Sequence, residues 1–486
     1  MLDRSHLVDA LVLAAVLVLV LAWPVLSPPI SHHGEAREGL VVQDIVAHGH
    51  WVLPRRNGEL PSKPPLFHWS AAAATHLFGA GDASLRLPSA AAALLVVLAT
   101  YALGVLIGGR ITGWLASGVL LGMAPFLAAA GEARVDMVFA ATITVALAAF
   151  YVWDARGRPA ARALCYAGAA AAVLAKGPAG AVLPALVILV FLAVERRLGA
   201  LWQLFSWPLV LATLAIDGGW YGLAYADGGG AFLHLQLVHE NLERIVGGAS
   251  FHHSDRNGFG RMAMSLLTGL LPWSLALAWC AIEPVRDGRL DRPARFLHTW
   301  WIVVLAVFTL AAGRRAVYLL PACPAVALLA GRLLAAGVRE HDGATSWLRW
   351  LPPPAQLRRL FPHHPRLALI GLALVAFDLG ALLVLQTVRE TRARRGSLVA
   401  FADAVRRTVP ESATLLAATG LRRDETLILA YRTARAIPRE HEQPEPGAYY
   451  LVPAAEGSQR WWVGYTMVAE SKRARGPNVA LMRSPE

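Results

Sequence analysis

Long apolar runs separated by short polar connections make up most of the chain. Runs of roughly 17 to 22 residues are long enough for a helix to cross a bilayer, and they predict about 11 to 13 transmembrane helices. The clearest runs lie near residues 7–25, 88–107, 111–130, 135–152, 161–175, 179–194, 201–216, 263–282, 297–312, 316–336 and 367–387. The predicted fold is a mainly α polytopic membrane protein.

Two segments depart from this pattern. Residues 66–78 are apolar but interrupted by His68 and His76, which predicts an interfacial or re-entrant helix. After about residue 388 the chain becomes polar and predicts a small α/β domain. Its helices are expected near 398–408 and 425–434, and its strands near 413–418, 449–453, 461–469 and 479–483. The expected domains are a transmembrane domain over 1–387, with outer loops at about 27–87 and 217–262, and a periplasmic α/β domain over 388–486.

Composition supports the membrane class, because 56% of the residues are hydrophobic and only 16% are charged. The net charge of +12 is interpreted as arginines that follow topology and anionic lipid, and nucleic acid is not expected as a partner. The cysteines, Cys165, Cys280 and Cys323, lie far apart in apolar segments and offer neither a disulfide framework nor zinc spacing.

Arginines in the short loops predict the orientation. The positive-inside rule places the loops that carry them on the cytoplasmic side, and the N-terminus with them. These arginines are Arg110, Arg156, Arg158, Arg162, Arg196, Arg197, Arg286, Arg289, Arg292 and Arg295. The loops with mixed acids and bases then face outward, together with the C-terminal domain.

Unpaired charge beside a membrane is costly, so the outward clusters are candidates for chemistry or ligand binding. Lys63 and Lys176 are the only lysines of the membrane region, and a compact ammonium suits a phosphate. Snorkelling at a span end is the alternative for each lysine. Glu132 and Asp136 crowd one short connection, where helix capping is the alternative to a second catalytic carboxylate.

Histidines also gather on the outer side. His239, His252 and His253 are weak candidates for a divalent metal site, because no pair among them has standard ligand spacing. The sequence shows no nucleotide-binding loop, so sugar would arrive by another route, such as a lipid-linked donor.

An ordered series of motifs carries a family resemblance over roughly residues 7 to 336. The motifs are Glu35-Ala36-Arg37, Lys63-Pro64-Pro65-Leu66 with Trp69, Arg86-Leu87-Pro88-Ser89, Ala133-Arg134-Val135-Asp136-Met137, Leu174-Ala175-Lys176-Gly177-Pro178, Pro272-Trp273-Ser274 and Tyr318-Leu319-Leu320-Pro321. In this series the chain resembles polyprenyl-phosphate-sugar glycosyltransferases. It is most similar to the lipid A aminoarabinose transferases and more distantly to the protein O-mannosyltransferases.

The resemblance implies an inner-membrane glycosyltransferase of the C-type fold. Such an enzyme transfers a sugar, with inversion, from a polyprenyl phosphate to a lipid, glycan or protein acceptor on the periplasmic face. It implies that the donor phosphate is held by Lys63, Arg37, Lys176, Arg244 and Tyr318. The implied catalytic acids are Glu35, Asp136 and Glu132, with Glu35 the first choice for a base, and Glu35→Gln is expected to abolish transfer in a folded protein.

Two positions depart from the family pattern. Gly34 stands where the family has the first Asp of an Asp-Glu pair, and Ser62 stands where the aminoarabinose transferases have an acid before the lysine. The first departure puts the usual base in question, and the second removes an expected metal ligand.

Two other functions fit the same charges. A transporter or flippase for lipid-linked sugar would bind anionic lipid without chemistry, and a non-catalytic assembly subunit would have lost its base at Gly34. A glycosyltransferase requires that the outer acids and bases converge on one region.

Overall fold

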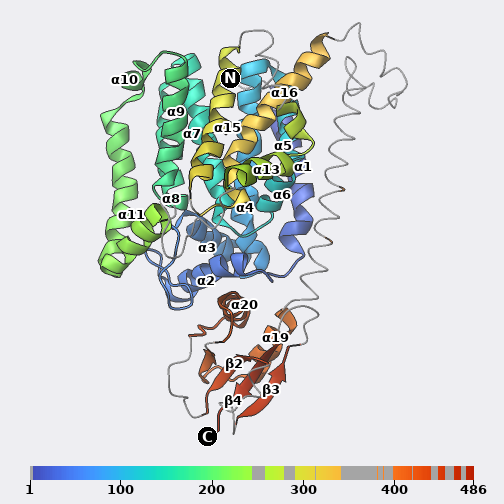
Figure 1. Cartoon of the computed structure of the whole chain (residues 1–486), viewed down its shortest axis with the longest axis vertical. Helices are drawn as coiled ribbons and strands as arrows, with labels where there is room; N and C mark the ends of the chain where they lie inside the picture. The colour runs from blue at the N-terminus through green and yellow to red at the C-terminus, as the bar shows by residue number, and fades with distance from the viewer. Residues whose placement is uncertain are drawn as a thin grey trace, which may run out of the picture.

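The computed structural model describes residues 4–243, 258–277, 290–311, 313–340, 398–418, 420–438, 447–454, 465–471 and 478–485, with residues 380 and 387. A helical bundle carries the N-terminal part of the chain, and a small α/β unit lies at one end of it (Figure 1). Helices α2 and α3 lie between the two, at the lower end of the bundle in this view. The run expected at 367–387 and the end of the run at 263–282 fall outside the described residues.

The helices of the bundle follow the order of the predicted runs and include two, α2 and η1, in segments that were expected as outer loops. They are α1 (Arg4–Leu26), α2 (His33–His48), α3 (Leu66–Phe78), α4 (Asp82–Gly108), α5 (Arg110–Leu121), α6 (Ala124–Ala130), α7 (Val135–Arg156), α8 (Pro159–Lys176), α9 (Ala179–Val194), α10 (Ala200–Leu204), α11 (Trp207–Leu233), the π-helix η1 (His234–Leu242), α13 (Gly258–Gly269), α15 (Arg292–Leu310), the 3₁₀ helix η2 (Ala316–Ala322) and α16 (Cys323–Glu340). The chain is therefore mainly α, as predicted.

Six helices of the described part are long and apolar enough to cross a membrane, which confirms a multi-span membrane protein. The bent pair α5 and α6, which meet at 72°, would make a seventh span. Other predicted spans fall short of this measure: α9 has only 16 residues, and α8 is rich in alanine and carries Arg162 and Lys176. Helix α11 also continues through residues 217–233, which were expected in an outer loop.

Small residues let the helices of the bundle approach closely. A Cβ on Gly180 would lie 2.1 Å from the carbonyl carbon of Ala172, so only glycine permits this contact between α9 and α8. Aromatic side chains fill the space where α7, α9 and α15 meet, with the rings of Phe191 and Phe296 centred 5.2 Å apart.

The described arginines of the short loops, which exclude Arg286 and Arg289, gather at the end of the bundle away from the α/β unit. Arg110 donates to Asp9 near the N-terminus, at the top of Figure 1. Asp154 pairs with Arg197 at 3.2 Å and with Arg292. Arginines that were expected to share one side therefore share one end of the fold.

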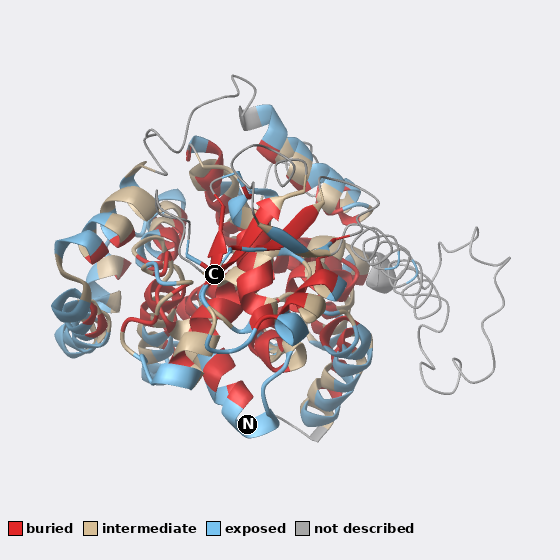
Figure 2. Ribbon diagram, turned by 90° about the horizontal axis from the view of Figure 1, so that it is seen from below, coloured by how far each residue is buried: buried red, intermediate tan, exposed pale blue. Residues whose placement is uncertain are grey.

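The C-terminal unit confirms the predicted α/β arrangement. It contains α19 (Val399–Thr408), β1 (Leu415–Ala417), α20 (Arg423–Thr433), β2 (Tyr449–Pro453), β3 (Thr466–Glu470) and β4 (Val479–Arg483). The sheet order is β1-β2-β4-β3, with β1 parallel to β2 and the other pairs antiparallel. Strands β2 and β4 are buried in the middle of the sheet, and the strands form a largely buried patch near the C-terminus in Figure 2.

Helix α20 packs the unit against α2 and the start of α4. The hydroxyl of Tyr431 donates to Asp82 at 2.6 Å, and its carbonyl accepts from Gln43 at 3.1 Å. Asn57 and Ile437 exchange hydrogen bonds in both directions. A Cβ on Gly39 would lie 2.5 Å from the Tyr431 ring, so the glycine makes room for this contact.

Candidate active site

Helix α2 carries the first group of candidate residues. His32 caps its start by accepting the backbone N–H of Gly34 at 3.1 Å. A β-extended cap followed by a carboxylate in the first turn is favourable at a helix N-terminus, because both suit the exposed N–H groups there. Glu35 and Glu38 are three residues apart, so they project from neighbouring positions of the helix surface.

Glu35 is fully engaged with its neighbours. Arg86 on α4 donates to both of its oxygens, at 2.8 and 3.0 Å, and the backbone N–H of Ala133 donates at 2.9 Å. Arg86 also donates to the carbonyl of Pro28 at 2.7 Å. The pair ties α2 to α4 and to the loop before α7, and it leaves the carboxylate few lone pairs for a substrate.

Glu38 is buried and bonded to Arg37 and His68. Arg37 donates to one oxygen, and His68 on α3 lies 2.8 Å from the other. Burial favours the neutral acid, but Arg37 and His68 outweigh it and hold the pKa of Glu38 well below its usual range. Glu38 is therefore ionised in the folded protein.

Lys63 lies in the connection between α2 and α3. Its Nζ is 2.5 Å from the carboxylate of Glu240, and the two side chains are only 11% and 10% exposed. Glu240 belongs to η1, where Gln236 donates to the carbonyl of Pro61 at 2.8 Å. The Pro61 contact and the ion pair together fix η1 against the segment that carries the lysine.

Lys176 and Asp136 form the second lysine–carboxylate pair. The lysine Nζ lies 2.6 Å from Asp136, which also pairs with Arg134 at 3.2 Å. The same Nζ stands 4.1 Å from the centre of the Tyr318 ring and 4.9 Å from that of Phe139. Two residues predicted to bind phosphate, one from α8 and one from η2, thus meet in direct contact.

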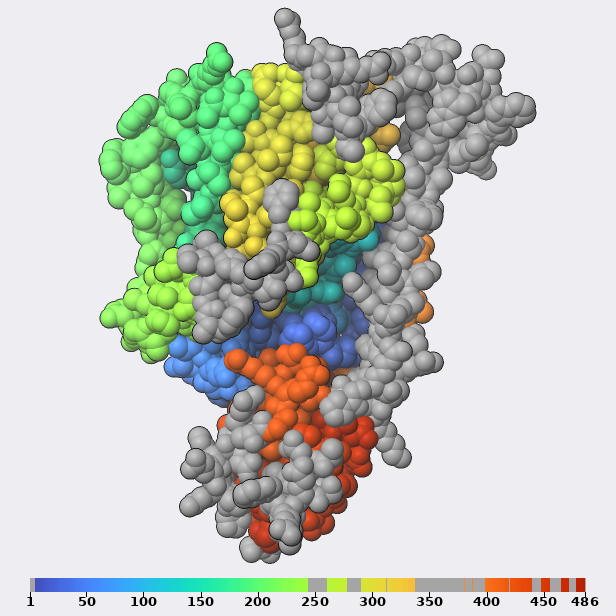
Figure 3. Space-filling model, in the orientation of Figure 1, coloured from blue at the N-terminus to red at the C-terminus, as the bar shows by residue number. Residues whose placement is uncertain are grey.

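These groups converge on one region. Glu38 is the main cause that raises the pKa of Arg37, and Glu240 and Asp136 add to it, which places both pairs near α2. Burial lowers the pKa of His33, and the nearby charges of Arg37, Arg315 and Arg134 lower it further. Figure 3 shows the α2 and α3 segments, in blue, between the bundle above and the α/β unit below.

The structure separates or omits other predicted residues. Glu132 is 38% exposed, 3.8 Å from Arg134, and is the most exposed of the three candidate acids. His239 bonds to Glu243 at 2.8 Å, a pair that supplies only two metal ligands. The other predicted residues, Arg244, His252 and His253, lie outside the described residues.

The structure shows the neighbours of Gly34 and Ser62, the two residues that depart from the family pattern. A Cβ on Gly34 would lie 3.0 Å from the His32 ring and 3.8 Å from the Arg134 guanidinium, so the histidine fills space beside the glycine. The hydroxyl of Ser62 accepts from Arg56 at 3.3 Å. A serine hydroxyl held in this way fits a metal poorly, because divalent metals in proteins prefer carboxylate, imidazole and thiolate ligands.

Sequence reasoning missed the pairing of Glu38 with His68. Neither residue belongs to a recognisable sequence motif, and only the packing of α2 against α3 brings them together. It also missed the pattern Asp44-x₃-His48-x-His50, whose spacing across the end of a helix was a usable signal.

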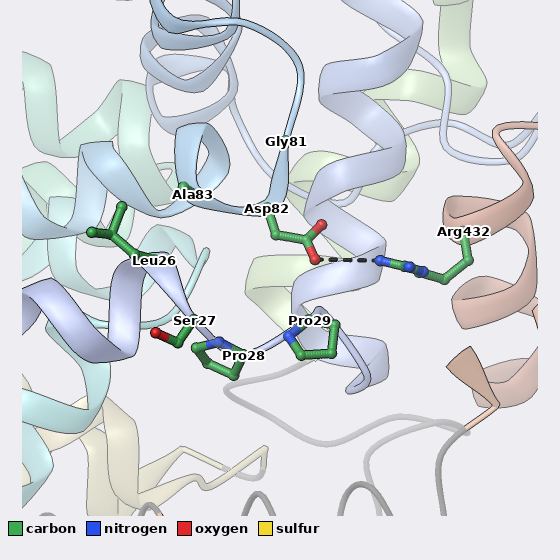
Figure 4. Close-up of a pocket in the computed structure, with 8 residues that line it drawn as sticks. All are labelled: Leu26, Ser27, Pro28, Pro29, Gly81, Asp82, Ala83 and Arg432. Carbon is green, nitrogen blue, oxygen red and sulfur yellow. Dashed lines mark hydrogen bonds and ion pairs between the residues drawn. The ribbon is translucent and has the colours of Figure 1, made fainter. Parts of the chain in front are cut away.

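A separate pocket of about 450 Å³ lies between the end of α1, the start of α4 and α20 (Figure 4). Its only charged lining residues are Asp82 and Arg432, which pair at 3.4 Å. None of the predicted site residues that the structure describes lines it.

Comparisons with known proteins found a matching family model and similar folds. The family model described as dolichyl-phosphate-mannose-protein mannosyltransferase matches residues 62–232. In the solved structures, ArnT from Cupriavidus metallidurans bound to undecaprenyl phosphate superposes with a TM-score of 0.79 at 20% identity, over 99% of this chain and 98% of that one. The chain has the ArnT fold. The Archaeoglobus fulgidus oligosaccharyltransferase is more distant, with a TM-score of 0.55 at 13% identity over 93% of this chain and 70% of that one.

Similar sequences carry related names. One undecaprenyl phosphate-alpha-4-amino-4-deoxy-L-arabinose arabinosyl transferase, from Pseudomonas fluorescens, is 28% identical over 69% of this chain and 59% of its own length. Another, from Pseudomonas aeruginosa, is 30% identical over 64% of this chain and 58% of its own length. The chain thus spans less than two thirds of the length of these relatives. The resemblance to polyprenyl-phosphate-sugar glycosyltransferases is confirmed, and it extends to an ArnT-like fold.

Proposed function

We propose that this protein is a membrane glycosyltransferase that takes a sugar from a polyprenyl-phosphate donor and transfers it with inversion. The observation that carries the proposal is the convergence of two buried lysines, Lys63 and Lys176, with Arg37 and Tyr318 in one region of an ArnT-like fold. Cleavage of a sugar–phosphate bond leaves negative charge on the lipid phosphate. Cations placed in advance stabilise that charge as it develops.

The lysine–carboxylate pairs support this role. In each pair the carboxylate holds the ammonium in place, so a phosphate oxygen would meet a cation whose position is already fixed. Tyr318 would add a hydroxyl donor beside Lys176.

The acceptor follows from the state of the acids. Glu35 is saturated by Arg86 and Ala133, and Asp136 is held by Lys176 and Arg134. A carboxylate whose oxygens already accept several hydrogen bonds has little room left for a substrate hydroxyl. We therefore assign Glu35 a positioning role and favour a lipid-borne phosphate as acceptor, since an anionic nucleophile needs no base. If a hydroxyl of a glycan or protein is the acceptor, Glu132 is the most exposed carboxylate for the task.

We also place the site and the domain over 388–486 on the periplasmic face of a bacterial inner membrane. Support comes from the arginine-rich loops, which gather at the opposite end of the bundle. A cysteine at exposed Glu411 should react with a membrane-impermeant maleimide in spheroplasts, whereas one at exposed Arg158 should react only after lysis. The reverse pattern would invert the topology.

The activity is tested with purified protein and a synthetic polyprenyl-phosphate sugar. Lys63→Ala and Lys176→Ala should lose transfer, and Arg406→Ala, which removes an exposed cation on α19, should keep it. Mass spectrometry of lipids, glycans and envelope proteins from cells with and without the gene identifies sugar and acceptor together. Movement of intact lipid-linked sugar across the membrane, with no transfer, would support a transporter instead.

A further inference from the structure

A second group of ligating side chains lies at the far end of α2 from the cap. Asp44 and His48 stand one helical turn apart, and His50 follows the helix end. The Nδ1 atom of His48 lies 3.0 Å from one Asp44 oxygen, and the Nδ1 atom of His50 lies 2.9 Å from the other. Among the described residues this is the one group of three such side chains whose ligand atoms lie within 4.8 Å of one another.

The backbone explains why the three meet. Gly49 adopts a left-handed conformation with φ of 71°, which closes the helix and turns the chain so that His50 returns over the last turn. The rings of His48 and His50 are stacked, with centroids 5.5 Å apart. The backbone N–H of Arg55 donates at 2.7 Å to the same Asp44 oxygen that faces His50, and this bond holds the carboxylate in place.

We propose that Asp44, His48 and His50 form a binding site for a divalent transition metal, with Zn²⁺ the best match. Two imidazoles and one carboxylate are a common zinc ligand set, and water would complete a tetrahedron. Zinc–ligand bonds of about 2.0 to 2.2 Å place neighbouring ligand atoms roughly 3.3 to 3.5 Å apart. The 3.0 and 2.9 Å separations end on different oxygens of Asp44, and the three ligand atoms lie within 4.8 Å of one another. The side chains must therefore shift by up to roughly 1.4 Å to share one ion. The exposed rings permit this shift, since they are 63% and 52% exposed.

The location gives the metal a structural role. It would clamp the start of the connection that leads from α2 to Lys63. That connection is already held at two later points: Trp69 donates to the carbonyl of Trp51 at 2.6 Å, and Trp220 donates to the carbonyl of Val52 at 3.0 Å. The site is distinct from His239, His252 and His253.

Metal binding by the full-length protein tests the proposal directly. The protein is purified in detergent without a polyhistidine tag, and Zn²⁺ affinity is measured by competition with a chromophoric chelator. Co²⁺ in place of Zn²⁺ reports tetrahedral coordination by its visible absorption. The matched control is His76→Asn, which removes another exposed histidine near the same connection, stacked on Trp51 at 6.1 Å.

We expect one equivalent of metal in the wild-type protein and in His76→Asn. His48→Asn and His50→Asn should each weaken binding by at least about tenfold and remove the Co²⁺ absorption. Equal affinity and stoichiometry in the wild type and the double variant would overturn the proposal. So would a wild-type protein that takes up no Zn²⁺ or Co²⁺ at ~100 μM.

Discussion

The Glu35–Arg86 pair offers a direct test of whether Glu35 has a structural or a catalytic role. Its two hydrogen bonds measure 2.8 and 3.0 Å, and the side chains are only 10% and 3% exposed. At such a separation two unit charges attract by about 6 kcal/mol at an effective dielectric constant near 20. Removing one partner of a buried pair costs about 3–5 kcal/mol, because the other charge stays behind without compensation.

Glu35→Gln should therefore destabilise the protein. The amide offers one oxygen to Arg86 but turns an N–H₂ donor toward another donor. We expect a loss near the lower end of that range, about 3 kcal/mol, because Arg86 keeps its bond to Pro28. Thermal unfolding in detergent measures the effect, and Glu411→Gln, which removes an exposed carboxylate, is the matched control.

A second variant separates charge pairing from packing. Replacing both partners together, as Glu35→Leu with Arg86→Met, should be less destabilising than Arg86→Met alone, because no buried charge is left unpaired. The reasoning is refuted if Glu35→Gln unfolds at the wild-type temperature and yet transfers no sugar. That outcome would return Glu35 to the role of catalytic base.

Three further outcomes follow from the geometry. Lys176→Ala should lower kcat on the order of 100-fold, measured with saturating donor, because it removes a preset cation from the leaving phosphate. Gly39→Ala should cost about 1–3 kcal/mol in thermal unfolding, because its Cβ would meet the Tyr431 ring at 2.5 Å. Burial lowers the pKa of His32 and His33, so the unfolded chain binds more protons than the folded protein below about pH 6.5. The stability of the folded protein should therefore fall as the pH drops. Asparagine at both positions should flatten this dependence of stability on pH.

The sequence predicts elements best where the chain itself marks their ends. The helix at Leu66–Phe78 begins after Pro65 and ends before Gly79, and the prediction matched both bounds. Strands β2 and β4 were also placed to the residue, because their apolar runs are short, Gly447 comes just before β2, and Asn478 directly precedes β4. Local punctuation of this kind needs no knowledge of the partner element.

Prediction fails where tertiary surroundings override such marks. Asp217 and the glycines after it were expected in a loop, yet the chain stays helical to Leu233, with one break at Gly229. The indole of Trp220 donates to the carbonyl of Val52 and so fixes this part of the helix against the α2–α3 connection. The run at 111–130 was expected as one span, but α5 and α6 meet at 72° near Pro125, since proline cannot continue the earlier helix.

The site shows the same division between residue type and pairing. The motifs identified Lys63, Lys176 and Tyr318, and the structure brings the last two into contact. No pattern within the sequence indicated that Glu35 would form an ion pair with Arg86, which follows 51 positions later. Such a long-range pair depends on how α2 packs against α4, and the local hydrophobic periodicity of a helix does not predict its crossing angle with another helix.

The paired charges also bear on how an anionic donor would be recognised. Lys63 with Glu240 and Lys176 with Asp136 are each close to neutral as a pair. The folded protein therefore avoids the cost of isolated buried ammonium groups. A phosphate must then share each lysine with its carboxylate, which weakens ground-state binding. Its attraction grows as the sugar leaves and charge accumulates on the phosphate oxygens. Such a site favours the transition state over the bound donor, which is the condition for a binding group to accelerate a reaction.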